Sequence, residues 1–232
     1  MEKNRMMRLA SGLLVLTLLT TCMISGTYAK YVTQGTGTDT ARVAKWGVTV
    51  TANGTTFAKE YTKDDENAAT ITNSVVSTDD NKLVAPGTKG TMTKIILGGT
   101  PEVAVKVSYV GQFDISDNWK VDGEFYCPLV IKVKSGTDTV TTIKGIDYTS
   151  AADFEKGVND AIAAYSSNYD ANTDLSTKSD DSLTVEWEWP FSTMNDDKTS
   201  NDEKDTFLGG QAASNNSATV TLTVTTTVTQ ID

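Results

Sequence analysis

A strict two-residue alternation near the C-terminus limits this chain to a small set of folds. Between Thr219 and Gln230, threonine alternates with a second set of mostly apolar side chains. In an extended chain that second set lies on one face: Val220, Leu222, Val224, Thr226 and Val228. The opposite face carries Thr219, Thr221, Thr223, Thr225 and Thr227. The pattern predicts an antiparallel β-strand with one face in a hydrophobic core and the other in water.

Shorter alternating runs along the 232 residues extend this prediction to the whole chain. They are Val43–Val50, Met92–Leu97, Val103–Phe113 and Val185–Trp189. Threonine, which is β-branched and favours strands, makes up about one residue in six. The dipeptide Pro86-Gly87 predicts a type II turn between strands. We therefore expect residues 41–232 to form an all-β domain, an antiparallel jelly-roll-like β-sandwich.

One segment has helical periodicity instead. Ser150 is placed to cap a helix, and apolar residues follow it at spacings of three and four. They are Phe154, Val158, Ala161, Ile162 and Tyr165. The spacing predicts a helix from Ala151 to Tyr165, within an insertion of about residues 136–182 that ends in a polar linker, Asn168–Asp181.

The first 29 residues have the form of a secretory signal peptide. Lys3, Arg5 and Arg8 precede an apolar run of about 16 residues, and the segment Ser25-Gly26-Thr27-Tyr28-Ala29 follows it. We expect cleavage between Ala29 and Lys30, which makes the protein secreted, in the extracellular matrix or at the cell surface. An uncleaved anchor and lipoprotein processing at Cys22 are the alternatives. The apolar run is shorter than the about 20 residues of a stable membrane span.

Charge and composition exclude several classes of function. Removal of residues 1–29 leaves 17 Lys and Arg against 29 Asp and Glu, a net charge of −12. Such an acidic chain is not suited to bind nucleic acid or an anionic membrane surface. It contains no histidine, so serine–histidine, cysteine–histidine and histidine-based zinc chemistry are excluded. We therefore expect no enzyme. Cys127, the one cysteine left after cleavage, is expected to be a buried apolar residue.

Two groups of residues are candidates for ligand binding. Asp196, Asp197, Asp202 and Asp205 supply oxygen atoms that could hold calcium, although the spacing is not that of an EF-hand; otherwise they belong to a solvated loop. No other cofactor is expected. Trp187 and Trp189 share one face of a strand and could bind sugar rings, but such residues belong more often to the core. Glu186 and Glu188, on the opposite face, have the spacing of a glycosidase pair without further support.

The segment directly after the cleavage point is the candidate for assembly. Residues 30–40 are prone to extended structure but too rich in glycine and polar residues to require burial in their own domain. Such a terminus can add as a strand to the open sheet edge of another subunit, or it can be a flexible leader. The donor residues would be Lys30, Tyr31, Val32, Thr33, Gln34, Thr36 and Thr38.

Several short motifs resemble the TasA/camelysin family of exported biofilm-matrix proteins from Gram-positive bacteria. Gly26-Thr27-Tyr28-Ala29, followed by Lys30-Tyr31, is similar to the family's pattern at the cleavage site. The segment Leu83–Gly90 resembles the family's turn before a strand, and Glu102–Phe113 resembles the strand that follows. Asp196–Gly209, leading into Thr219–Gln230, is similar to the family's acidic loop and last core strand. The similarity covers the framework strands over about half of the mature chain.

The resemblance implies a particular biology. It implies a jelly-roll sandwich with a helical insertion, processing by a signal peptidase of the SipW type, and fibres built by donor-strand exchange through Lys30 to about Thr40. It also implies a minor anchoring or initiating matrix protein as a second partner. Some family members are called metalloproteases, an activity that a chain without histidine does not support.

The leading hypothesis is therefore a secreted structural subunit of an extracellular fibre, joined to its own copies head to tail. The alternative is a monomeric cell-surface module that binds carbohydrate or matrix, using the two tryptophans and a calcium loop. A protease or glycosidase is the third hypothesis and the least supported by the residues.

Overall fold

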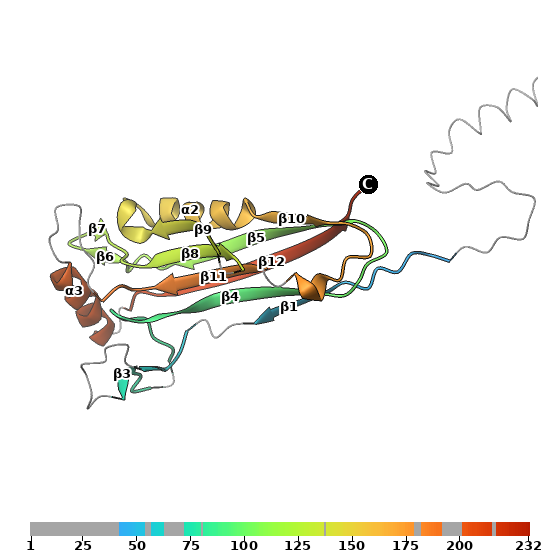
Figure 1. Ribbon diagram of the computed structural model, residues 1–232. Helices are drawn as coiled ribbons and strands as arrows, with labels where there is room; N and C mark the ends of the chain where they lie inside the picture. Colours follow the sequence, from blue (N-terminus) through green and yellow to red (C-terminus); the bar gives the residue numbers. More distant parts are fainter. Residues whose placement is uncertain are drawn as a thin grey trace, which may run out of the picture. The chain divides into compact units, whose positions relative to one another are not determined.

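The computed structural model describes residues 42–53, 57–62, 72–79, 81–136, 138–178, 182–191, 201–214 and 217–232. The chain divides into two units, Met1–Val43 and Ala44–Asp232. All the strands and helices named below belong to the second unit (Figure 1).

The larger sheet has five antiparallel strands in the order β1-β4-β11-β8-β9. The strands are β1 (Thr49–Asn53), β4 (Lys89–Gly98), β8 (Val130–Ser135), β9 (Asp138–Lys144) and β11 (Leu183–Glu188). A turn enters β4 as the sequence predicts. Gly87 has a φ of +82°, and the Thr88 N–H donates to the Ala85 carbonyl at 3.0 Å.

A second antiparallel sheet has the order β10-β5-β12. Its strands are β5 (Val105–Ile115), β10 (Ser166–Tyr169) and β12 (Val220–Gln230). β5 and β12 pair over their full length with no break in register, from Val220 opposite Ile115 to Gln230 opposite Val105. Buried side chains of the two sheets belong to one hydrophobic core, which we call the β-core. The antiparallel all-β class expected from the sequence is confirmed.

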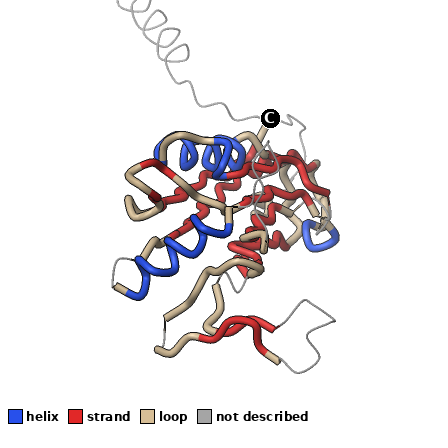
Figure 2. Tube along the Cα trace, turned by 90° about the vertical axis from the view of Figure 1, so that its left-hand side faces the viewer, coloured by secondary structure: helices blue, strands red, loops and turns tan. Residues whose placement is uncertain are grey.

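Two small sheets adjoin the β-core. One pairs β2 (Glu60–Thr62) with β3 (Asn73–Val76), and the other pairs β6 (Lys120–Val121) with β7 (Glu124–Phe125). Figures 1 and 2 show the β2–β3 pair set apart from the longer strands. The rings of Phe57 and Tyr61 connect this segment to the core, with centroids 5.2 Å and 6.2 Å from that of Trp187.

The helix expected after Ser150 is present as α2 (Ala151–Ala163). The Ser150 hydroxyl accepts a hydrogen bond from the Asp153 N–H at 3.1 Å, which is the expected cap. Phe154, Val158 and Ile162 are buried along one face. The stripe of apolar residues thus predicted both the start of the helix and its buried side, although the helix ends two residues earlier than expected.

The surrounding segment is not the simple insertion that the sequence suggested. β9 adds to β8 of the larger sheet, and β10 adds to β5 of the second sheet. Short 3-10 turns, η1 (Gly145–Asp147) and η2 (Leu175–Thr177), lie before and after α2, and Leu175 is fully buried. The segment expected to be a polar linker therefore supplies the last two residues of β10, Asn168 and Tyr169, and the core residue Leu175, because sheet pairing stabilises strands that have little apolar pattern of their own.

A second helix, α3 (Asp202–Ala213), occupies what was expected to be a loop. Its first turn contains Asp202, Glu203 and Asp205, and acidic side chains are favourable near the positive end of a helix. Leu208 is buried in the core. Gly209 and Gly210 lie inside the helix, where glycine is unfavourable, and this hid the helix from sequence analysis.

Among the residues that the structure describes, no helix is both long and apolar enough to cross a membrane. The expected apolar signal segment lies outside those residues.

Candidate assembly site: the open edge of β12

One edge of β12 is paired, and the other, called the open edge below, has no strand partner among the described residues. β5 is its only strand partner among the described residues. At one end of the pair the Ser116 N–H donates to the Thr219 carbonyl, and at the other the Ile231 N–H donates to the Ala104 carbonyl. Residues 219 and 231 therefore turn their backbone groups toward β5. Since these groups alternate in an antiparallel strand, odd-numbered residues face β5 and even-numbered residues face the open edge.

The same even-numbered residues carry the row that the sequence assigned to the core. Val220, Leu222, Val224 and Val228 pack against the core but are only partly buried, as is Thr226. The expectation of a fully buried face is therefore only half met. On the larger sheet, Val50 of β1 pairs with buried Leu97 and so shares its inward face, yet 43% of Val50 is exposed. Apolar side chains on the inward faces of both β1 and β12 thus remain partly exposed to solvent.

This edge lacks the devices that usually protect an open strand. Native edges are kept apart by charged residues, proline, bulges or short length. β12 has 11 residues, contains no charged residue or proline, and keeps an unbroken register with β5. Its geometry therefore permits the addition of another strand along the whole length.

The far edge of the same sheet is covered instead. β10 pairs with Val105–Ser108 of β5, and α2 lies beside the rest of that strand. The Asn159 Oδ1 accepts from the Phe113 N–H at 2.8 Å, and the Glu155 Oε1 accepts from the Ile115 N–H at 2.9 Å. Side chains of a helix thus take the hydrogen-bonding place of a strand at this edge, in contrast to the open edge of β12.

The proposed cleavage and donor residues, Ala29, Lys30, Tyr31, Val32, Thr33, Gln34, Thr36 and Thr38, lie outside the described residues. The second unit has its first residues beside the β4–β5 connection. There the Lys45 N–H donates to the Glu102 Oε2 at 2.8 Å, and the Glu102 N–H donates to the Lys45 carbonyl at 2.9 Å. This connection also meets the end of β12, through the bond between Ala104 and Ile231.

The acidic cluster does not come together as a calcium loop in the described residues. Asp196 and Asp197 lie outside them, while Asp202 and Asp205 are on α3. Asp205 is buried: its Oδ1 accepts from the Tyr126 hydroxyl at 2.7 Å, and its Oδ2 accepts from the Trp189 Nε1–H at 3.3 Å. No cluster of three metal-binding side chains occurs in the described part of the chain. The expectation of a loop at Asp202 and Asp205 is wrong, because the helix directs Asp205 into the core.

Burial raises the pKa of Asp205 above its ordinary value. The hydrogen bonds from Tyr126 and Trp189 act in the opposite direction, and the charge of Asp202 adds to the increase. The Lys204 ammonium lies over the Tyr126 ring, 5.1 Å from its centroid. Asp205 therefore attaches α3 to two aromatic residues of the core.

Trp187 and Trp189 are core residues, with 2% and 5% of their surface exposed. Trp187 packs on Phe57 and Tyr61, and the Trp189 ring lies 5.7 Å from that of Trp119. Neither offers an open ring face to a sugar, so the interpretation as core residues is confirmed. Glu186 and Glu188 form ion pairs with Lys134 at 3.0 Å and with Lys132 at 2.8 Å.

Cys127 is fully buried, as expected, and burial raises the pKa of its thiol well above the usual range. A thiol that is neither exposed nor ionised is not a nucleophile, which agrees with a structural role.

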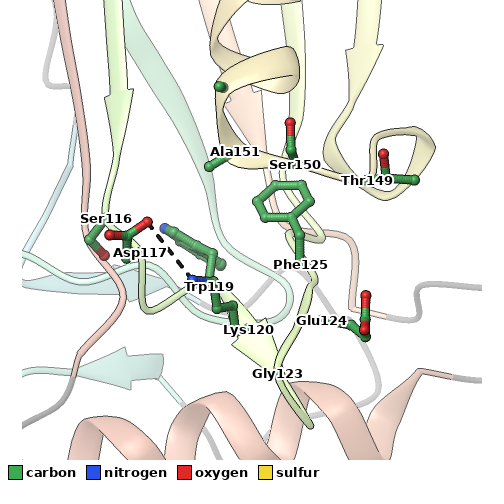
Figure 3. A pocket seen from close by; sticks show the side chains of 11 residues that line it. Ser116, Asp117, Trp119, Lys120, Gly123, Glu124, Phe125, Thr149, Ser150 and Ala151 are labelled. Atoms are coloured by element: carbon green, nitrogen blue, oxygen red, sulfur yellow. Dashed lines mark ion pairs between the residues drawn. The ribbon is translucent and has the colours of Figure 1, made fainter.

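A pocket of about 350 Å³ lies between the β6–β7 turn and the start of α2 (Figure 3). Several of its polar groups already have roles in the fold. The Ser150 hydroxyl caps α2, the Trp119 Nε1–H donates to the Thr219 carbonyl at 2.9 Å, and Lys120 pairs with Asp117 at 3.9 Å (Figure 3). These side chains therefore contribute to packing and capping around the pocket.

Sequence analysis missed the open edge itself. Alternation identifies a strand and its two faces, but it does not tell whether one or two neighbours pair with that strand. The one sequence feature that could have indicated an open edge is the absence of charged residues from Thr219–Gln230 in a strongly acidic chain.

A scan against protein-family models, a search of curated proteins and a search of solved structures each gave no match.

Proposed function

We propose that this chain is a secreted structural subunit of an extracellular, biofilm-matrix fibre. Copies join head to tail when residues 30–40 of one copy add as a strand to the open edge of β12 in the next. In this proposal the β-core is a jelly-roll-like sandwich that lacks one strand. The single observation that carries the proposal is the long, uncharged edge of β12, which no strand of the described residues pairs with.

The interactions available at this edge are those of strand addition. The even-numbered residues of β12 offer backbone N–H and C=O groups that β5 does not use. The row of Val220, Leu222, Val224 and Val228 has apolar surface left to cover. Main-chain hydrogen bonds would supply affinity, while the side chain of either Tyr31 or Val32, which lie on opposite faces of a strand, would cover part of that surface.

Donor and acceptor sites differ, so the joint would be heterologous and would propagate as a filament. The donor segment, from Lys30 to Thr40, equals β12 in length. A signal peptidase of the SipW type would free it by cleavage after Ala29, and a minor matrix protein would anchor or initiate the filament. No cofactor is part of this function.

The first test compares the mature chain starting at Lys30 with a shorter chain starting at Ala41. Size-exclusion chromatography and negative-stain microscopy should show filaments for the first and monomers for the second. Monomers from both chains would contradict self-assembly. Filaments from both would place the joint outside residues 30–40.

A second variant tests the acceptor edge. Val224→Pro removes an N–H that faces the open edge and leaves the ladder with β5 intact, since proline is tolerated on the free side of an edge strand. Val224→Ala is the matched control, because it trims the side chain but keeps the N–H. We expect folded monomers from the proline variant and filaments from the control. Filaments from the proline variant would exclude β12 as the acceptor.

A further inference from the structure

The outward face of the β10-β5-β12 sheet is open to solvent and consists mainly of hydroxyl and amide side chains. Residues paired across neighbouring strands share a face, so the exposed threonines of β12 lie beside the outward residues of β5. These pairs are Thr221–Asp114, Thr223–Gln112, Thr225–Val110, Thr227–Ser108 and Thr229–Lys106. Ser166 and Asn168 of β10 continue the same face on the other side of β5.

This face carries little charge for so acidic a chain. Lys106 and Asp114 are the only charged residues that its three strands present there, although the mature chain expected after cleavage has a net charge of −12. Neither forms an ion pair within the described part of the chain. At the centre of the face, 61% of Val110 is exposed. Acidic copies that repel one another elsewhere can therefore approach at this face without a net charge between them.

The two charged residues lie symmetrically about Val110. Lys106 comes four residues before it and Asp114 four residues after it on β5, so each lies about 13 Å from it. Consider a two-fold axis through Val110, between two facing copies and perpendicular to the strands. Such an axis sets two β5 strands antiparallel against each other, brings Lys106 of each copy near Asp114 of the other, and puts Val110 against its own counterpart. The face is therefore complementary to itself under this rotation.

We infer that this outward face docks on the same face of a second copy of the chain, with the two β5 strands antiparallel. The contact is separate from the open edge of β12, so it does not depend on strand addition; in a fibre it joins neighbouring filaments side by side. β5 and β12 each have 11 residues, about 35 Å, and the face is two to three strands wide, so one pair buries on the order of 1,000 Å². That is the area of a weak interface, and many such contacts along two filaments add up to a stable one.

Cross-linking at the proposed axis tests this pairing in the mature chain, whether or not that chain forms filaments. Val110→Cys puts a thiol on the axis, where a short bis-maleimide should link two copies into a dimer on a denaturing gel. Buried Cys127 does not interfere. Val76→Cys is the matched control, because Val76 is a similarly exposed valine, at 56%, on β3. Equal rates of dimer formation from the two variants would overturn the inference.

Charge reversal then tests the orientation of the pair. In the Val110→Cys chain, either Lys106→Asp or Asp114→Lys sets like charges against each other at both ends, and should slow dimer formation about three- to tenfold. A mixture of these two variants has opposite charges at both ends again and should restore the rate. Lys144→Asp makes the same change of charge at an exposed residue of β9 and should leave the rate unchanged. A mixture that links no faster than either variant alone would overturn the inference.

Failure of this pairing and failure of the proposed function give different results. Val110→Cys dimers without filaments would refute strand addition at β12 and support the face-to-face pair. Filaments without dimers would do the reverse. Chains that stay unlinked but sediment with an uncharged polysaccharide such as cellulose would assign the face to a glycan and overturn the inference.

Discussion

At the scale of single residues, Asp205 shows how a polar group can attach an element to an apolar core. Its two oxygens accept hydrogen bonds from Tyr126 and Trp189, both largely buried. Burial raises the pKa of this carboxyl, so the folded protein holds the proton more tightly than the unfolded chain does. The ionised form therefore reduces stability at neutral pH, while its hydrogen bonds fix the position of α3.

Replacement of Asp205 separates the two effects. Asp205→Ala leaves the Tyr126 hydroxyl and the Trp189 N–H without their acceptor, and should lower the free energy of unfolding by about 2–4 kcal/mol. Asp205→Asn can keep both hydrogen bonds, because its amide can donate to the Tyr126 oxygen, and should be close to wild type at pH 7. Urea denaturation measures both values.

The pH dependence gives the sign of the charge effect. As the pH falls from about 7 toward 4, Asp205 takes up its proton earlier in the folded state, which increases wild-type stability relative to Asp205→Asn. Below the ordinary carboxyl pKa of about 3.9 this relative gain is complete. Asp117→Asn, at a side chain that is 95% exposed, is the control. A relative loss of wild-type stability over this interval would show that the pKa of Asp205 is lowered.

At the scale of elements, α2 is fitted closely to β5. Gly111 lies in the middle of β5, where a Cβ atom would be 2.7 Å from the Ile162 Cδ1 and 3.1 Å from the Asn159 Oδ1. Asn159 is also the residue that accepts from the Phe113 N–H. Because Gly111 has no side chain, α2 can come close enough to β5 to cover the edge of that strand.

Gly111→Ala tests this fit. The added methyl group should push α2 outward and lower the free energy of unfolding by about 1–3 kcal/mol, measured by urea denaturation. Gly209→Ala in α3 is the matched control, because a Cβ there meets nothing within 4 Å. Alanine also favours a helix, so this control should gain up to about 1 kcal/mol. Equal stability of Gly111→Ala and wild type would contradict the close packing of α2 on β5.

The elements also show how far sequence reasoning reaches. β12, the turn at Pro86-Gly87 and the capped start of α2 were predicted because each depends on local pattern. β9, β10 and α3 were not, because sheet neighbours and the buried contacts of Asp205 and Leu208 stabilise them against weak local preference. Trp187 and Trp189 followed the general tendency of aromatic residues toward the core. The open edge of β12 depends on which strands pair, and alternation alone does not encode that.

At the scale of the whole molecule, charge and assembly act against each other. The mature chain expected after cleavage carries a net charge of −12. Copies of it repel one another in solution, which opposes association and keeps a monomer soluble. All residues of β12, from Val220 to Gln230, are uncharged. The attraction at this edge therefore has to come from backbone hydrogen bonds and from burial of apolar side chains. Salt screens the repulsion between acidic copies but does not weaken these two interactions to the same extent.

Ionic strength should therefore control the rate of assembly of the chain starting at Lys30. An increase from about 0.01 M to 0.15 M salt shortens the screening length from about 30 Å to 8 Å and reduces the repulsion between acidic copies. We expect a shorter lag and faster growth, followed by light scattering, with no growth from the chain starting at Ala41. Val224→Pro should stay monomeric at both salt concentrations, which separates growth at β12 from salt-induced aggregation. Slower growth at the higher concentration would show that opposite charges hold the joint, and the uncharged edge of β12 would then not be its main contact.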